Sequence, residues 1–274
     1  ALTSMLEKNE TLKKLMLDQT PWVQAAQSNS SRMAMLASLL DPAVASAAVE
    51  KYMNKLAKLQ NGDGGFRWGS WSGESSEWTT RNVLVTLGIA RSLGMLPDKF
   101  DPMLRNAFTY LQVQAAKPNR PATDDQLALI AAYFPAYPRT VAGQEIIRRT
   151  VAATAANWKS GDTVDKAYDT FILNANGRKA EAAKVMASIR QFAVAKPGMG
   201  LCFPNVNDMR GYATIIQAYS AMDASTEEID ALRQYVIVQA QALDDIGAAN
   251  PDYIVASVLM TGSDWTSVPV AQNV

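Results

Sequence analysis

The fold class follows from a glycine-rich stretch at residues 59–66, which reads LQNGDGGF, and from the helical patterns on either side of it. Before it, apolar residues at 44–59 recur three and four positions apart, after an Asp41-Pro42 pair that is typical of a helix start. After it, residues 83–93 repeat the same spacing. The stretch therefore joins two predicted helices through a tight turn that ends in an aromatic residue.

Helical spacing continues along the rest of the chain, and no alternating strand or Asn-Gly hairpin signal interrupts it. Two capping boxes are predicted, at Thr123 with Gln126 and at Ser225 with Glu228. The whole pattern predicts about ten or eleven helices and an all-α fold. The further predicted helices cover residues 101–111, 127–130, 146–151, 168–172, 182–189, 212–218, 229–238 and 253–259.

The glycine-rich turn returns later in the chain. Residues 198–203 read GMGLCF and lead to an apolar helical pattern at 212–218, and a weaker copy runs from 238 to 259. The repeated unit is a helix, a glycine-rich loop with an aromatic residue, and a second helix. Repeated helix pairs either stack into an open solenoid or close into a ring.

Composition excludes several classes of protein. The 274 residues carry 26 basic and 26 acidic side chains, so no net charge attracts nucleic acid or an anionic membrane. No apolar run approaches the ~20 residues of a membrane span. The chain has no histidine and one cysteine, which excludes histidine-activated nucleophiles, histidine or all-cysteine zinc sites and an internal disulfide. It begins at Ala1 without Met, which we interpret as a processed product or an excised piece.

Six segments, taken together and in order, resemble the bacterial α2-macroglobulin family. The similarity is to the thioester-domain-like helical region of large cell-envelope macroglobulins of Bacteroides-type bacteria. This resemblance implies an α/α toroid over residues 1–266, as in terpenoid cyclases and prenyltransferases, and an extended tail at 267–274 that leads to a following domain. The segments are LEKNETLK (6–13), TPWVQAA (20–26), RMAMLASLLD (32–41), LAKLQNGDGGF (56–66), GMGLCFPN (198–205) and LMTGSDW (259–265).

The resemblance also implies a function. It predicts a non-enzymatic domain of an exported protease trap in the periplasm or cell envelope. Its partners would be the neighbouring macroglobulin β-domains and, through the parent protein, target proteases, with no cofactor and no contact with nucleic acid or membrane. The reactive Cys-x-Glu-Gln motif of the family is missing, because Cys202 is followed by Phe203-Pro204-Asn205. Either the motif lies upstream of Ala1 or the parent has none.

The loop between the first two predicted helices holds the candidate binding residues. Phe66, Arg67, Trp68, Trp71 and Trp78 lie within thirteen residues, and Trp and Arg dominate binding hot spots. They predict a surface that contacts a neighbouring domain, a peptide or a sugar. The competing interpretation is core packing, which we favour for Phe66 and Trp78, whereas Arg67, Trp68 and Trp71 are left open.

Two alternative functions remain: a carbohydrate-active α/α-toroid hydrolase or lyase, and a scaffold that binds a protein partner through the tryptophan loop. The acidic pairs Asp124-Asp125 and Asp244-Asp245 are not dyads, since adjacent helical residues do not face each other; we expect the first pair to cap a helix. Asp63 is expected to bond its own loop. Cys202 is expected to pack as a small apolar residue.

Overall fold

The computed structural model describes residues 42–92, 96–120, 123–206 and 209–242. In these residues the chain forms nine α-helices, two short 3-10 helices and one two-stranded sheet, which confirms the predicted all-α class. The helices are α5 (Pro42–Ala57), α6 (Glu77–Ser92), η1 (Asp98–Phe100), α7 (Asp101–Ala115), α8 (Asp125–Tyr133), α9 (Val141–Asn157), η2 (Trp158–Ser160), α10 (Thr163–Ala175), α11 (Lys179–Arg190), α12 (Met209–Ala221) and α13 (Thr226–Ala242).

Several predictions lie outside the described residues. They are the helix at 253–259, the Asp244-Asp245 pair, the tail at 267–274, and the segments of the resemblance before residue 42 and after residue 258. The chain divides into two compact units, unit 1 (residues 1–47 and 192–274) and unit 2 (residues 48–191). Unit 2 contains most of α5 and all of α6 to α11, and the described part of unit 1 contains the first residues of α5, the sheet, α12 and α13.

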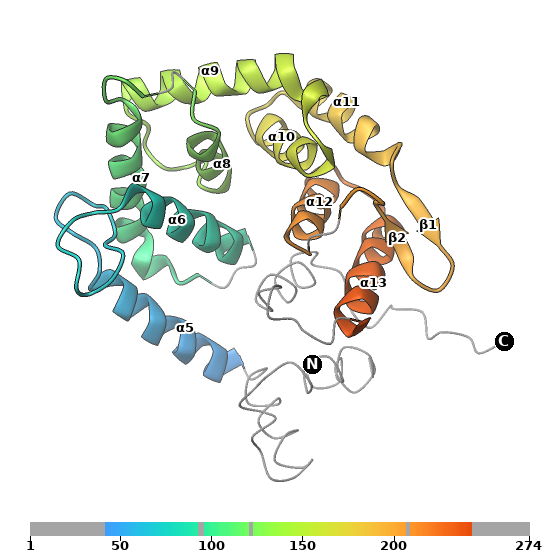
Figure 1. Cartoon of the computed structure of the whole chain (residues 1–274). Coiled ribbons are helices and arrows are strands. Elements are labelled where there is room, and N and C mark those ends of the chain that lie inside the picture. The colour runs from blue at the N-terminus through green and yellow to red at the C-terminus, as the bar shows by residue number, and fades with distance from the viewer. Residues whose placement is uncertain (1–41, 93–95, 121–122, 207–208, 243–274) are drawn as a thin grey trace, which may run out of the picture. The chain divides into compact units, whose positions relative to one another are not determined.

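Unit 2 is built from two layers of helices (Figure 1). In one layer α8 packs against both α6 and α10, and in the other α7 packs against α9. Each helix also contacts the next one along the chain, from α6 through to α11. Contacts to both the next helix and the next but one are typical of stacked helix pairs. The helix α8 touches four neighbours, so it is buried almost all round, from Leu127 to Ala131 and at Tyr133.

Side chains at the helix starts explain where these helices begin. The predicted capping box at Thr123 and Gln126 is wrong by one position, because Asp124 is the N-cap of α8 and accepts a hydrogen bond from Leu127 N. An aspartate cap has the same effect, since its carboxylate satisfies a free backbone N–H. The expected role of the Asp124-Asp125 pair in capping is thereby confirmed. The box at Ser225 and Glu228 forms as predicted at the start of α13.

A charged cluster ties α6, α7 and the α8–α9 connection together. The Asp101 carboxylate accepts hydrogen bonds from Arg91 Nη1 (2.5 Å), Tyr137 Oη (2.5 Å) and Arg105 Nε (2.8 Å). Burial by itself raises the pKa of Asp101, but the three hydrogen bonds outweigh it and lower the pKa to about 2. Asp101 is therefore ionised at neutral pH, and the cluster holds three elements of unit 2 in register.

Unit 1 contains a β-hairpin where no strand was predicted. Strands β1 (Val194–Lys196) and β2 (Gly200–Cys202) pair antiparallel, with Lys196 opposite Gly200. Three-residue strands are too short to show an alternating pattern, which is why the sequence did not predict them. The connection has Pro197 followed by Gly198 at φ +71°, and Met199 N donates to Lys196 O, as in a type II turn.

The strand β2 packs against α13, and its last residue enters the core of unit 1. Cys202 is 1% exposed, which confirms the expectation of a buried small residue, although it lies in a strand rather than a loop. The core around it includes Phe203, Tyr212 and Leu232.

Among the helices of the described residues, none has the length and apolarity to cross a membrane.

Candidate interaction surface

The α5–α6 connection folds back on itself through short backbone bridges. Gln60 pairs with Phe66, and Arg67 pairs with Ser75, each as an isolated antiparallel bridge. Asp63 Oδ1 accepts hydrogen bonds from Gly65 N (3.0 Å) and Ser75 Oγ (2.6 Å), so the predicted local role of Asp63 is confirmed. These contacts turn residues 67–75 into a closed loop that projects from the end of α5 and the start of α6.

Phe66 anchors this loop in the core. Its side chain is fully buried, as predicted, and its backbone N–H donates to Thr80 Oγ1 at 2.8 Å. Gly64 lies two residues earlier at φ +89°, with its Cα against the Asn106 carbonyl of α7. A side chain at residue 64 would collide with this carbonyl, so only glycine lets the loop approach α7 closely.

Three tryptophans of the candidate set are exposed around this anchor. Trp68 is 56% exposed, Trp71 79% and Trp78 60%. The Trp68 and Trp78 rings contact each other with centroids 4.9 Å apart, and the Trp71 ring lies over Gly69. The predicted packing of Trp78 is therefore wrong: Trp78 is in the first turn of α6, on its solvent side, and its ring covers Trp68 instead of the core. The loop and the first turn of α6, together called the tryptophan loop below, thus carry three exposed indoles, and exposed apolar surface of this kind marks interaction sites.

Arg67 supports the loop from below. Its Nη2 donates to Lys58 O at 2.6 Å, which ties the loop to the residue that directly follows α5. Its Nε is buried and has no hydrogen-bond partner in the described part of the chain. The structure thus gives Arg67 a positioning contact and leaves one buried donor without an acceptor, which costs free energy.

The charges next to the tryptophans neutralise one another. Glu77 accepts hydrogen bonds from Arg81 Nη2 (2.5 Å) and Arg120 Nη2 (2.6 Å), and Arg81 also contacts Asp124 Oδ2 at 2.6 Å. These pairs hold the first turn of α6 against the start of α8. Because the pairs are closed, the surface around Trp78 presents aromatic faces rather than a free charge.

The described residues contain no group of three or more His, Cys, Asp or Glu side chains that could hold a metal ion.

The sequence did not reveal two features of unit 2. One is Asp169 on α10, whose pKa is raised to about 6 by burial and by the negative charges of Asp165 and Asp125. The other is a cleft beside α9 lined by arginines. Its residues are spread over forty positions in sequence, so no local motif could reveal it.

Comparison with known proteins adds no family to these observations. A scan against protein-family models finds no match, and a search of curated proteins finds no matching protein.

Proposed function

We propose that this chain is a non-enzymatic helical domain of a bacterial α2-macroglobulin-like protease inhibitor, and that it docks on a neighbouring domain through its tryptophan loop. The observation that carries the docking proposal is the trio of exposed rings at Trp68, Trp71 and Trp78. Aromatic residues of this kind are enriched at the centres of protein interfaces. The inhibitor part of the proposal is supported by the six resembling segments.

The same proposal extends to the finer architecture. The layered helix pairs of unit 2 and the glycine-aromatic turns of both units fit an α/α toroid. In such an inhibitor the domain packs against macroglobulin β-domains before a protease cuts the parent and is released afterwards. The parent would be exported to the periplasm or cell envelope. Its trap would be steric unless a thioester lies upstream.

Cross-linking of the full-length parent protein tests the docking step. Lys58 is exposed, and its carbonyl accepts a hydrogen bond from Arg67 at the start of the loop, so its ammonium group is a suitable attachment point. We expect cross-links from Lys58 to another domain in the intact protein and their loss after protease cleavage. The double variant W68A/W71A should lose the same cross-links while it remains folded. The matched control W158A changes a tryptophan outside the loop and should keep them.

Protease assays of the parent protein test the inhibitor step separately. A trapped protease still cleaves small peptides but not large protein substrates, because the trap blocks access rather than the active site. Treatment with methylamine then separates two mechanisms: a mass gain of one methylamine with one new thiol indicates a thioester, and no change indicates steric trapping. Equal loss of cleavage for small and large substrates, or no loss for either, would refute the trap.

The carbohydrate-active alternative has one observation in its favour. A general acid of a glycosidase needs a raised pKa, and Asp169 has one, near 6. If the alternative holds, the chain releases reducing ends from a polysaccharide and the D169N variant does not. We expect no such activity from either protein.

A further inference from the structure

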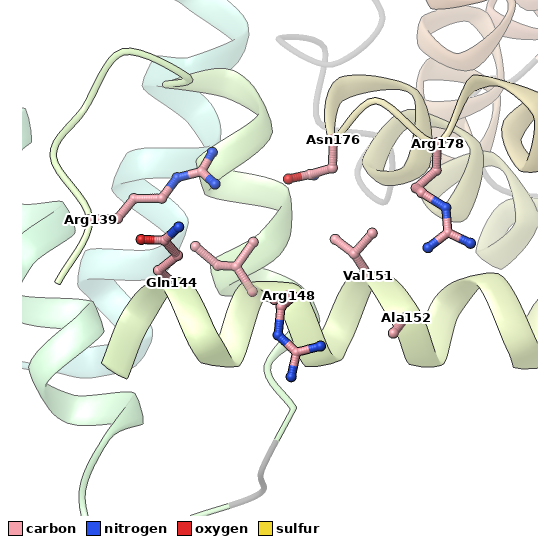
Figure 2. Close-up of a pocket in the computed structure, with 8 residues that line it drawn as sticks. Arg139, Gln144, Arg148, Val151, Ala152, Asn176 and Arg178 are labelled. Atoms are coloured by element: carbon pink, nitrogen blue, oxygen red, sulfur yellow. The ribbon is translucent and has the colours of Figure 1, made fainter. Parts of the chain in front are cut away.

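A cleft of about 340 Å³ lies beside α9 in unit 2, away from the tryptophan loop in sequence (Figure 2). Three segments build it: the end of the α8–α9 connection, one side of α9 itself, and the α10–α11 turn. The residues used below are Arg139, Gln144, Ile147, Arg148, Asn176 and Arg178.

Local structure places these side chains around one space. Arg139 precedes Thr140, the N-cap of α9, and Gln144 and Arg148 follow one turn apart along that helix. In the α10–α11 turn, Asn176 and Arg178 flank a residue with positive φ, Gly177. Figure 2 shows the side chains of Arg139 and Asn176 extending toward each other from opposite sides above α9.

The cleft carries an excess of positive charge. Arg148 forms a two-point contact with Glu145, through Nε (2.8 Å) and Nη2 (2.7 Å), and Arg149 contacts the same carboxylate at 2.6 Å. Arg178 is paired with Glu181. Arg139 makes no hydrogen bond or ion pair within the described residues. One glutamate thus serves two arginines, and a third arginine has all its donors available for a ligand.

The floor of the cleft is apolar and its rim is polar. Ile147 is 2% exposed and Val151 7% exposed, so both belong to the core, and they close the bottom of the space. Asn176 donates its Nδ2 to Ile172 O at 2.8 Å, which orients its amide and leaves the oxygen for another donor. A ligand that fits this arrangement has negative charge, an apolar part and amide groups.

From this combination we infer that the cleft binds a short acidic polypeptide segment. A carboxylate of the segment pairs with Arg139, a neighbouring apolar side chain rests on Ile147 and Val151, and backbone amides bond Gln144 and Asn176. A free phosphate would use the charge but not the apolar floor. The inference is independent of the docking proposed for the tryptophan loop, because the two use different residues.

Peptide binding to the 274-residue chain tests the inference. The probe is a capped pentapeptide with a central leucine and two glutamates on each side of it. Its affinity is measured by calorimetry at low salt. We expect R139Q to weaken binding about tenfold, the loss typical of one hydrogen-bonded charge. The control R149Q removes an exposed arginine that contacts Glu145 and does not line the cleft, and it should bind the peptide as the unchanged chain does.

Two further probes separate the possible outcomes. The same peptide with glutamine in place of glutamate should bind at least tenfold more weakly, and one with glycine in place of leucine should also lose affinity. Three results would overturn the inference: no binding to the unchanged chain, equal losses in R139Q and R149Q, or inorganic phosphate binding as tightly as the peptide. The last would assign the cleft to a small anion.

Discussion

The two glycine-rich turns, one in each unit, use the same contacts around different loops. In unit 2, Gly64 lies at φ +89° against a backbone carbonyl of α7, the second helix after the turn. In unit 1, Gly200 lies at φ +99° against the Ala231 carbonyl of α13, which is again the second helix after its turn. Each glycine allows a loop to touch a helix backbone at a distance that any side chain would prevent.

The aromatic residues of the two turns are also matched. Phe66 and Phe203 are both buried, and each donates its backbone N–H at 2.8 Å to a hydroxyl on the first helix after the turn, Thr80 Oγ1 or Tyr212 Oη. The difference lies in the chain that follows. Unit 1 goes almost directly into α12, whereas unit 2 inserts the tryptophan loop before α6. The shared contacts belong to the fold, and the inserted loop is free to carry function.

The largest expected effect comes from adding a methyl group to the two glycines. G200A and G64A each combine positive-φ strain with a collision against helix backbone, so we expect a loss of about 3 kcal/mol in unfolding free energy. Urea unfolding measures it. G62A is the control, since nothing lies within 4 Å of its new Cβ and its φ is ordinary. If G64A were as mild as G62A, the two turns would not be equivalent.

A smaller effect should follow from removing the hydroxyls. T80V and Y212F each leave a buried N–H without its acceptor, at a cost of about 2 kcal/mol. Hydrogen exchange at the amides of Phe66 and Phe203 reports this directly, and each variant should expose only its own amide. T109V is the control, because its hydroxyl is on the surface of α7. If the protection of the amide were unchanged in one of the two variants, the two turns would not depend on the same hydrogen bond.

The smallest expected effect is a pH dependence of stability that unit 2 has and unit 1 lacks. The pKa of Asp169 is raised to about 6, above its unfolded value near 4, so the folded state binds the extra proton between these values. Unit 2 should therefore lose about 1 kcal/mol of stability as the pH rises from 4 to 7, after allowance for partial exposure. D169N should abolish this loss. The hydrogen-exchange protection of the Phe66 amide in unit 2 should fall as the pH rises, whereas that of the Phe203 amide in unit 1 should not. Parallel changes at both amides would contradict the assignment of this effect to Asp169.

The sequence predicted the helices well because their apolar spacing is a local property. Helix α7 begins at Asp101-Pro102 and α5 begins at Pro42, as expected. The failures have physical causes. The hairpin of unit 1 is too short for a periodic signal. Trp78 was misplaced because α6 begins six residues before its apolar pattern, so Trp78 lies in a first turn that this pattern does not describe.

The candidate site was only partly predictable for a similar reason. Exposure of Trp68 and Trp71 depends on how the loop closes through Asp63 and Ser75, which no spacing rule describes. The arginine cleft requires the α10–α11 turn to meet α9, a tertiary contact between distant segments.

The single cysteine gives the molecule a built-in reporter. Cys202 is the one thiol in the chain, and at 1% exposure a thiol reagent can reach it only when the hairpin of unit 1 separates from its core. The rate of labelling therefore measures how often that opening occurs, with no engineered probe and no competing disulfide within the chain. A partner that holds unit 1 closed would lower the rate of Cys202 labelling, and a partner that draws the hairpin away from the core would raise it.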